Sequence, residues 1–80
     1  MEVTKFASKG CVKCKVLDNI LKQAGVKDYK VLYSEDNKEE FERNNITTFP
    51  TLLFENEDKR EILEGIVSAN MIKEAIAKVG

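Results

Sequence analysis

The strongest constraint on the fold is a change in hydrophobic period at residue 11. Val3–Ala7 is a short segment of strand character, and the sequence Ser8-Lys9-Gly10 ends it. From residue 12 onward the apolar residues recur three and four positions apart, which is the spacing of one helix face. They are Val12, Val16, Leu17, Ile20, Leu21 and Ala24. Gly25 is a natural residue to end this helix, so the chain begins with a strand that leads directly into a helix.

Three later segments are predicted to be strands. Tyr29–Ser34 and Thr51–Phe54 are rich in β-branched and aromatic residues, which is typical of strands. Arg60–Glu64 follows a predicted turn at Asn56–Asp58 and completes a hairpin with the segment before it.

Two more helices are expected. Asp36 or Asn37 can cap a short helix that ends at Arg43 and offers only Phe41 to the core. Ser68 can cap a last helix. The apolar face of that helix consists of Met71, Ile72, Ala75, Ile76 and Val79.

These elements predict the fold class α/β in a single domain over residues 1–80, with the order β-α-β-α-β-β-α. The first two strands are joined by a helix and should be parallel, with a right-handed crossover. The last two are joined by a tight turn and should be antiparallel. A four-stranded mixed sheet with its three helices on both faces satisfies these constraints. The expected core is Val3, Phe6, Val16, Leu17, Ile20, Leu21, Val31, Leu52, Phe54, Ile62, Leu63, Ile72 and Ile76.

Composition excludes several classes of function. The 80 residues include 13 Lys and Arg against 14 Asp and Glu, and this net charge of −1 argues against nucleic acid or an anionic membrane as a partner. No apolar run approaches the roughly 18 residues of a membrane span, and the first residues lack the apolar stretch of a signal peptide. The chain has no His, which excludes a Ser–His nucleophile and a His-ligated metal. We expect a cytoplasmic monomer.

The two cysteines, Cys11 and Cys14, stand where the first strand gives way to the first helix. A bridge across so short a loop removes little unfolded-chain entropy and is a poor structural staple. We interpret Cys11 as a nucleophile at the helix N-terminus and Cys14 as the residue that resolves the mixed disulfide. Cβ atoms three residues apart within a helix are about 5–6 Å apart, and a disulfide needs about 3.5–4.5 Å. A first cysteine in the non-helical cap position closes that gap.

The nucleophile needs a stabilised thiolate. A thiol with a pKa of about 8.5 is only a few per cent ionised at pH 7, and half-ionisation requires about 2 kcal/mol. A helix terminus supplies about 0.3–1 kcal/mol. Backbone N–H groups, the Cys14 thiol and the cations of Lys9 and Lys13 are candidates for the rest, so neutralising Lys13 should raise the thiol pKa slightly.

Two other classes of function remain open for the cysteine pair. Zinc needs four ligands, and two chains could supply four thiolates between them, so a dimer could bridge zinc or an iron–sulfur cluster. A redox-silent binding module is the other alternative. Metal content and thiol reactivity distinguish these possibilities.

The cysteine motif at this junction, together with Phe49-Pro50-Thr51-Leu52-Leu53-Phe54, resembles the thioredoxin/glutaredoxin superfamily. The resemblance implies a minimal thioredoxin fold. It also implies a cis bond before Pro50, the only proline, which would pack beside the Cys11 sulfur. The backbone of the residue before the proline would pair with the substrate chain.

The two halves of the chain resemble different branches of this superfamily. The N-terminal half begins directly with the active-site strand, as glutaredoxins do, and Cys-Val-Lys-Cys is most similar to the motif of glutaredoxin-like hydrogen donors for ribonucleotide reductase. The C-terminal half is similar to thioredoxins, and Gly65 matches a glycine that lets another backbone approach. The resemblance therefore implies a small glutaredoxin-like thioredoxin. The substrate-binding residues that it implies are Val12, Lys13, Thr48, Phe49, Pro50 and Gly65.

The sequence departs from the family patterns in several places. Ser8 replaces the Lys that glutaredoxins carry three residues before the first Cys, and Gly65-Ile66-Val67-Ser68 lacks their glutathione-binding Gly-Gly-x-Asp. Lys5 stands where thioredoxins have a buried carboxylate, so proton transfer to Cys14 cannot use that acid. We expect the Lys5 stem to be buried with its amine reaching solvent.

The resemblance implies a dithiol oxidoreductase that reduces protein disulfides and serves electron transport and redox homeostasis. No cofactor is expected, and the electrons would come from a thioredoxin-reductase-like donor or from glutathione. A glutathione-dependent glutaredoxin is the alternative within this class.

Overall fold

The strands and helices that the sequence predicts are all present in the computed structural model, which describes residues 1–80. Differences are confined to the ends of elements; the second strand, for example, is shorter than predicted. In chain order the elements are β1 (Glu2–Ala7), α1 (Val12–Gln23), β2 (Lys30–Tyr33), α2 (Lys38–Arg43), β3 (Thr51–Glu55), β4 (Arg60–Glu64) and α3 (Ala69–Val79).

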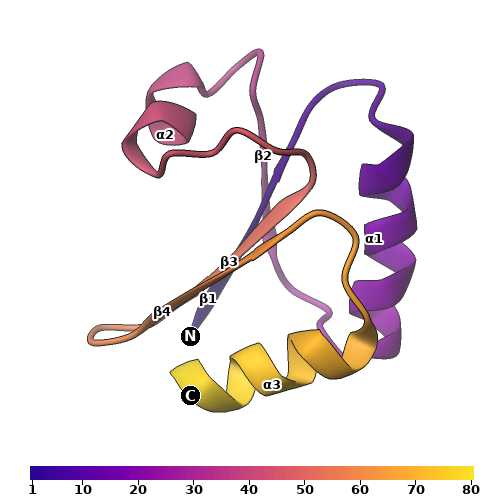
Figure 1. The fold of residues 1–80 in the computed structure, drawn as a ribbon, viewed down its shortest axis with the longest axis vertical. Helices are drawn as coiled ribbons and strands as arrows, with labels where there is room; N and C mark the ends of the chain where they lie inside the picture. Colours follow the sequence, from indigo (N-terminus) through magenta and orange to yellow (C-terminus); the bar gives the residue numbers. More distant parts are fainter.

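The four strands form one mixed sheet in the order β2-β1-β3-β4. β1 runs parallel to β2 and β3 runs antiparallel to β4, as the connections predict. The structure adds that β3 also pairs antiparallel with β1. Phe6 near the end of β1 pairs with Thr51 at the start of β3. The segment that leads to Cys11 and the segment that precedes Thr51 therefore meet at the same end of the sheet (Figure 1).

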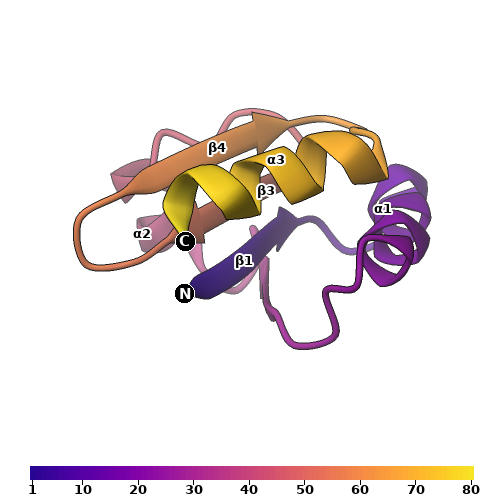
Figure 2. The ribbon, with the colours of Figure 1, turned by 90° about the horizontal axis from the view of Figure 1, so that it is seen from below.

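The helices cover both faces of the sheet. Figure 1 shows α1 and α3 on one side of the strands and α2 on the other, and Figure 2 shows α3 lying across the sheet. The local signals for the helix ends are also confirmed. Gly25, just past α1, has a φ of +84°, and the Ser68 hydroxyl accepts a hydrogen bond from the Met71 backbone N–H at 3.2 Å. None of the three helices has the length and apolar character that a membrane span requires.

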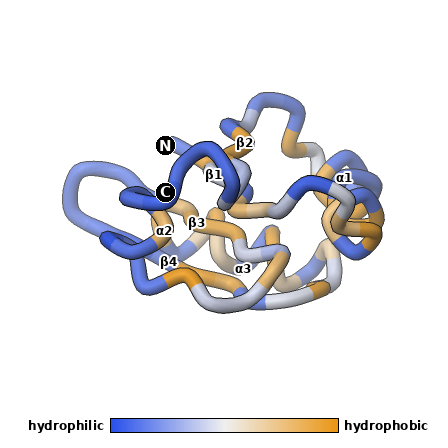
Figure 3. Tube along the Cα trace, turned by 90° about the horizontal axis from the view of Figure 1, so that it is seen from above, coloured by the Kyte–Doolittle hydropathy of each residue, from blue (hydrophilic) through white to orange (hydrophobic).

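The core consists of two apolar clusters of unequal size, one on each face. Side chains along β1 point alternately to the two faces of the sheet. Val3 therefore belongs to the larger cluster, on the side of α1 and α3, and Phe6 to the smaller one, on the side of α2. Figure 3 shows the hydrophobic colours gathered along the central strands and the hydrophilic ones on connecting loops. The larger cluster contains Val3, Leu17, Leu21, Leu52, Phe54, Val67, Ile72, Ala75 and Val79. The smaller one contains Phe6, Phe41 and Leu53.

Two residues of the predicted core lie at the surface instead. Val16 is 42% exposed because the buried face of α1 runs through Cys14, Leu17 and Leu21, and Val16 stands beside that face. Ile62 is 40% exposed. It pairs with Leu53 on the edge strand β4, on the face that only the short helix α2 covers. Val31, Ile20, Leu63 and Ile76 are half-buried.

Candidate active site

The two cysteines are joined as a disulfide at the N-terminus of α1. Cys11 is the N-cap residue and has an extended backbone, with φ −75° and ψ 109°. Its sulfur accepts a hydrogen bond from the backbone N–H of Cys14 at 3.1 Å. The Cα atoms are 5.3 Å apart, within the usual range for a disulfide of about 4.4–6.8 Å. The predicted position of Cys11 outside the helix is therefore confirmed.

The two cysteines differ in their exposure to solvent. Cys14 is only 5% exposed, whereas Cys11 is half-buried and is followed by the exposed residues Val12 and Lys13. Cys11 is therefore the more accessible cysteine of the pair. This asymmetry is what a nucleophile and a resolving thiol require.

The loop before Cys11 is fastened to the segment that follows β2. Both carboxylate oxygens of Glu35 accept hydrogen bonds from the Lys9 backbone N–H at 3.2 Å, and the Lys9 ammonium pairs with Asp36 at 3.2 Å. Of the two cations proposed to stabilise the thiolate, Lys9 is thus already paired with an acid. Hydrogen bonds from its own backbone N–H and from that of Lys9 hold the pKa of Glu35 below its usual value.

The loop before β3 brings Pro50 to the same end of the sheet. The Phe49–Pro50 peptide bond is cis. The Gly65 backbone N–H donates to the Pro50 carbonyl at 2.8 Å. The Thr51 hydroxyl donates to the Thr48 carbonyl at 2.6 Å and so braces the loop. Gly65 has a φ of +77°, a conformation that residues with a side chain rarely adopt, and the space where a Cβ would stand is open.

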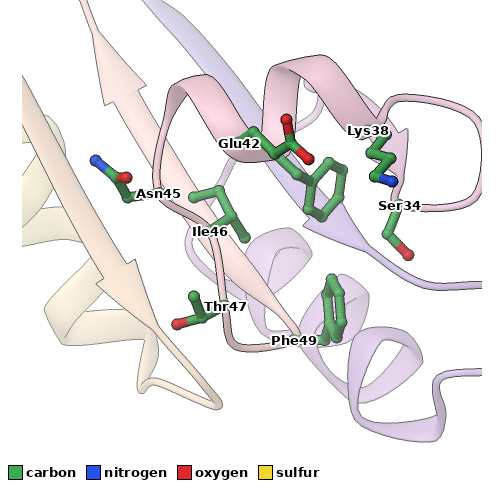
Figure 4. Close-up of a pocket in the computed structure, with 8 residues that line it drawn as sticks. Ser34, Lys38, Glu42, Asn45, Ile46, Thr47 and Phe49 are labelled. Carbon is green, nitrogen blue, oxygen red and sulfur yellow. The ribbon is translucent and has the colours of Figure 1, made fainter.

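Phe49 and Thr48 face different surroundings. Thr48 is exposed, while the Phe49 ring packs against Phe41 with the centroids 5.7 Å apart. Phe49 also lines a pocket of about 370 Å³ beneath α2. Figure 4 shows Lys38 and Ser34 together at one end of this pocket. The Phe49 side chain therefore belongs partly to the smaller core cluster, and the predicted role of its backbone does not depend on the ring.

Lys5 corrects one prediction. It is only 4% exposed, and its ammonium does not reach solvent but contacts the Asp18 carboxylate at 2.5 Å. The sequence predicts an amine that reaches solvent from a buried stem, and this prediction is wrong. The acid comes from α1, which packs over β1.

Tyr29 completes a small polar cluster around Asp18. The Tyr29 hydroxyl donates to Asp18 Oδ1 at 2.7 Å, the same oxygen that Lys5 contacts. Partial burial opposes ionisation of Asp18, but the hydrogen bonds from Lys5 and Tyr29 and the charge of Lys5 outweigh it, so the pKa of Asp18 is lowered. Burial, together with the hydrogen bond to Asp18 and its charge, raises the pKa of Tyr29 to about 12.

A sequence signal for Asp18 exists, although sequence reasoning missed this residue. A lysine in the middle of an apolar strand needs a partner, and α1 packs over that strand. Asp18 is the only acidic residue in α1. The sequence therefore contains enough information to predict the Lys5–Asp18 pair, because the helix that covers the strand has only one acidic residue.

Comparison with other proteins identifies the architecture. No protein-family profile matches the chain, and no curated protein matches its sequence. Desulfothioredoxin from Desulfovibrio vulgaris Hildenborough, however, superposes with a TM-score of 0.80 at 20% identity, over 98% of this chain and 80% of that one. The fold is that of thioredoxin.

Other structures agree with this thioredoxin fold. Thioredoxin from Fasciola hepatica gives a TM-score of 0.75 at 18% identity, over 98% of this chain and 79% of that one. A protein from X. campestris, XcR50, gives 0.73 at 14% identity, over 98% of this chain and 99% of that one. The resemblance found in the sequence is thus confirmed for the fold.

Proposed function

We propose that the protein is a thiol–disulfide oxidoreductase that reduces protein disulfides through Cys11 and Cys14. The observation that supports this most directly is the bonded pair at the N-terminus of α1, in which Cys11 is half-buried and Cys14 is buried. An exchange reaction needs this difference. The more accessible Cys11 attacks the substrate disulfide, and the buried Cys14 attacks only after the mixed disulfide has formed.

The reaction transfers two electrons in two exchange steps. The Cys11 thiolate attacks one sulfur of the substrate disulfide, whose S–S bond breaks, and the other substrate sulfur leaves and takes up a proton. Cys14 then loses its proton and attacks the Cys11 sulfur. The mixed disulfide breaks, the second substrate thiol is released, and the Cys11–Cys14 disulfide remains. A separate donor, a thioredoxin-reductase-like protein or glutathione, returns the two electrons.

The substrate surface in this proposal lies around Pro50. The backbone before Pro50 pairs with the substrate chain, and the open space at Gly65 admits that chain. Thr48, Val12 and Lys13, the other residues of the proposed surface, are exposed. An extended peptide that carries the target disulfide fits such a surface through main-chain hydrogen bonds.

Redox equilibration tests the proposal. The protein is equilibrated in glutathione buffers, and mass spectrometry reports the Cys11–Cys14 disulfide and any glutathione adduct. We expect an intramolecular disulfide with a midpoint in the range of about −270 mV for thioredoxins to about −200 mV for glutaredoxins. A persistent glutathione adduct at Cys11 would indicate the glutaredoxin reaction instead. If no disulfide forms at any ratio, the proposal is wrong.

A trapping experiment separates the roles of the two cysteines. With an oxidised model protein as substrate, Cys14→Ser should accumulate a mixed disulfide at Cys11, because the second step is blocked. Cys11→Ser should trap nothing, because the buried Cys14 cannot reach the substrate. Equal trapping by both variants would contradict the assignment of nucleophile and resolving thiol.

A further inference from the structure

The Lys5–Asp18 pair lies next to the buried cysteine. Asp18 follows Cys14 by four positions in α1, so the two side chains stand one helical turn apart on the same face, with Cβ atoms about 5–6 Å apart. Cys14, Lys5 and Asp18 also line one cavity of about 180 Å³ between α1 and the sheet. The pair is therefore placed where its charges act on the Cys14 sulfur.

The other charged or titratable groups at this cavity are few. Tyr33 lines it from β2, and Cys11 and Lys15 line it from α1 and its cap. Lys15 is exposed, as is Tyr33, so solvent screens the charge of the lysine. Lys5 is the buried cation of the cavity, and Asp18 is its only carboxylate.

We infer that Lys5 and Asp18 are positioning residues that set the ionisation of Cys14. The inference rests on the proposed function for its role in the second exchange step. In that step the buried Cys14 thiol must lose a proton, and a buried thiol ionises less readily than an exposed one. The Lys5 ammonium favours the thiolate and the Asp18 carboxylate opposes it, so the balance between the two charges decides how readily Cys14 attacks.

Opposite charges predict opposite effects of two substitutions. Lys5→Met leaves the carboxylate unbalanced beside Cys14 and should raise the midpoint of its ionisation by about one pH unit. Asp18→Asn leaves the ammonium unbalanced and should lower that midpoint by about one pH unit. Both substitutions break the same ion pair, so both should lower the stability of the fold. A purely structural role would predict the loss of stability without midpoints that move in opposite directions.

The rate at which Cys14 attacks the mixed disulfide should rise where its ionisation midpoint falls, and fall where that midpoint rises. A tenfold change in the thiolate fraction is partly offset, because the nucleophilicity of a thiolate falls with its pKa. Release of a preformed mixed disulfide from Cys11 at pH 7 should therefore become about threefold faster in Asp18→Asn and about threefold slower in Lys5→Met.

The test is a pH titration of the reduced protein labelled with ¹³C at the cysteine Cβ atoms, with Cys11→Ser used to assign the Cys14 signal. The matched control is Lys22→Met, because Lys22 is an exposed lysine further along α1. This substitution should leave the midpoint of Cys14 ionisation unchanged. Opposite shifts in Lys5→Met and Asp18→Asn support the inference.

An unchanged Cys14 midpoint in Asp18→Asn overturns the inference, and so does slower release in that variant, which would make Asp18 a proton acceptor. Asp18 is partly exposed, so Asp18→Asn decides the question alone if Lys5→Met does not fold. The titration does not require the protein to reduce a substrate. If the wild-type protein failed to reduce protein disulfides, the proposed function would fall, and the charge coupling would still be measured.

Discussion

Lys5 shows how one buried charge organises its neighbours. Its ammonium contacts Asp18 and lies 5.7 Å from the centre of the Tyr29 ring, close enough for a cation–π interaction. Tyr29 in turn donates its hydroxyl hydrogen to Asp18. No buried polar side-chain atom in the structure lacks a hydrogen-bond partner, and the cluster joins β1, α1 and the residue that precedes β2.

The ionisation of Tyr29 tests its contact with Asp18. The pKa of Tyr29 is raised from 10.0 to about 12, so the protonated hydroxyl stabilises the fold below pH 10, and this contribution is lost as the pH rises towards 12. In a Tyr33→Phe background, ultraviolet absorbance should report tyrosinate with a midpoint near 12. Asp18→Asn should lower the midpoint towards 10, because it removes the carboxylate that accepts the hydrogen bond. A midpoint near 10 with Asp18 intact would refute the contact.

The two longer helices begin at residues whose side chains accept hydrogen bonds. Ser68 caps α3 through its hydroxyl, and Cys11 caps α1 through its sulfur. At its other end α3 is tied to the β3–β4 turn, where the Asn56 side-chain amide donates to the Val79 carbonyl. Asn37, by contrast, precedes α2 without a side-chain capping bond. The two longer helices are thus fixed by local chemistry, while α2 depends on the contacts of Phe41.

Replacing the α3 cap tests this local contribution. Ser68→Ala should lower the free energy of unfolding by about 1 kcal/mol, because the Met71 backbone N–H loses its acceptor. Ser68→Asp should retain most of the stability, since its carboxylate can accept the same bond. Urea unfolding measures both variants. Equal losses in both variants would show that the hydroxyl does not cap the helix.

Local signals explain which features the sequence predicts. Gly25 and Ser68 mark helix ends, and the motif at residues 11–14 marks the junction of β1 and α1, so the order of elements and the position of the cysteines follow directly. The Lys5–Asp18 contact joins residues 13 positions apart and depends on how α1 packs over β1. The exposure of Ile62 likewise depends on how little of the sheet α2 covers.

At the scale of the whole molecule, the two faces of the sheet are unequally covered. The cluster between the sheet and the helices α1 and α3 contains nine buried residues, and the cluster between the sheet and α2 contains only three. Phe41 packs edge-on against Phe6, with ring centroids 5.0 Å apart, and it is the only buried residue of α2. The α2 face is therefore the one that can open without loss of the larger cluster.

Phe41→Ala should show this difference. Truncation of a buried phenylalanine costs about 3–5 kcal/mol, and the loss should fall mainly on α2. Native-state hydrogen exchange should find faster exchange at the Phe41, Asn44 and Ile46 amides, which bond within or next to α2. Amides of α1 and α3 should keep the order of protection that they have in the wild type. Uniform acceleration over all three helices would mean that the two clusters form one cooperative unit.

The two ends of the chain lie close together in both ribbon views (Figures 1 and 2). Glu2 opens the six-residue strand β1, which rises about 3.3 Å per residue and so separates that end from the loop before Cys11 by about 20 Å. A peptide tag or a fluorophore attached at either end would stand clear of the cysteines. Protein attached to a bead or a sensor surface by its ends would present its disulfide to the solution, where a dissolved substrate protein could reach Cys11.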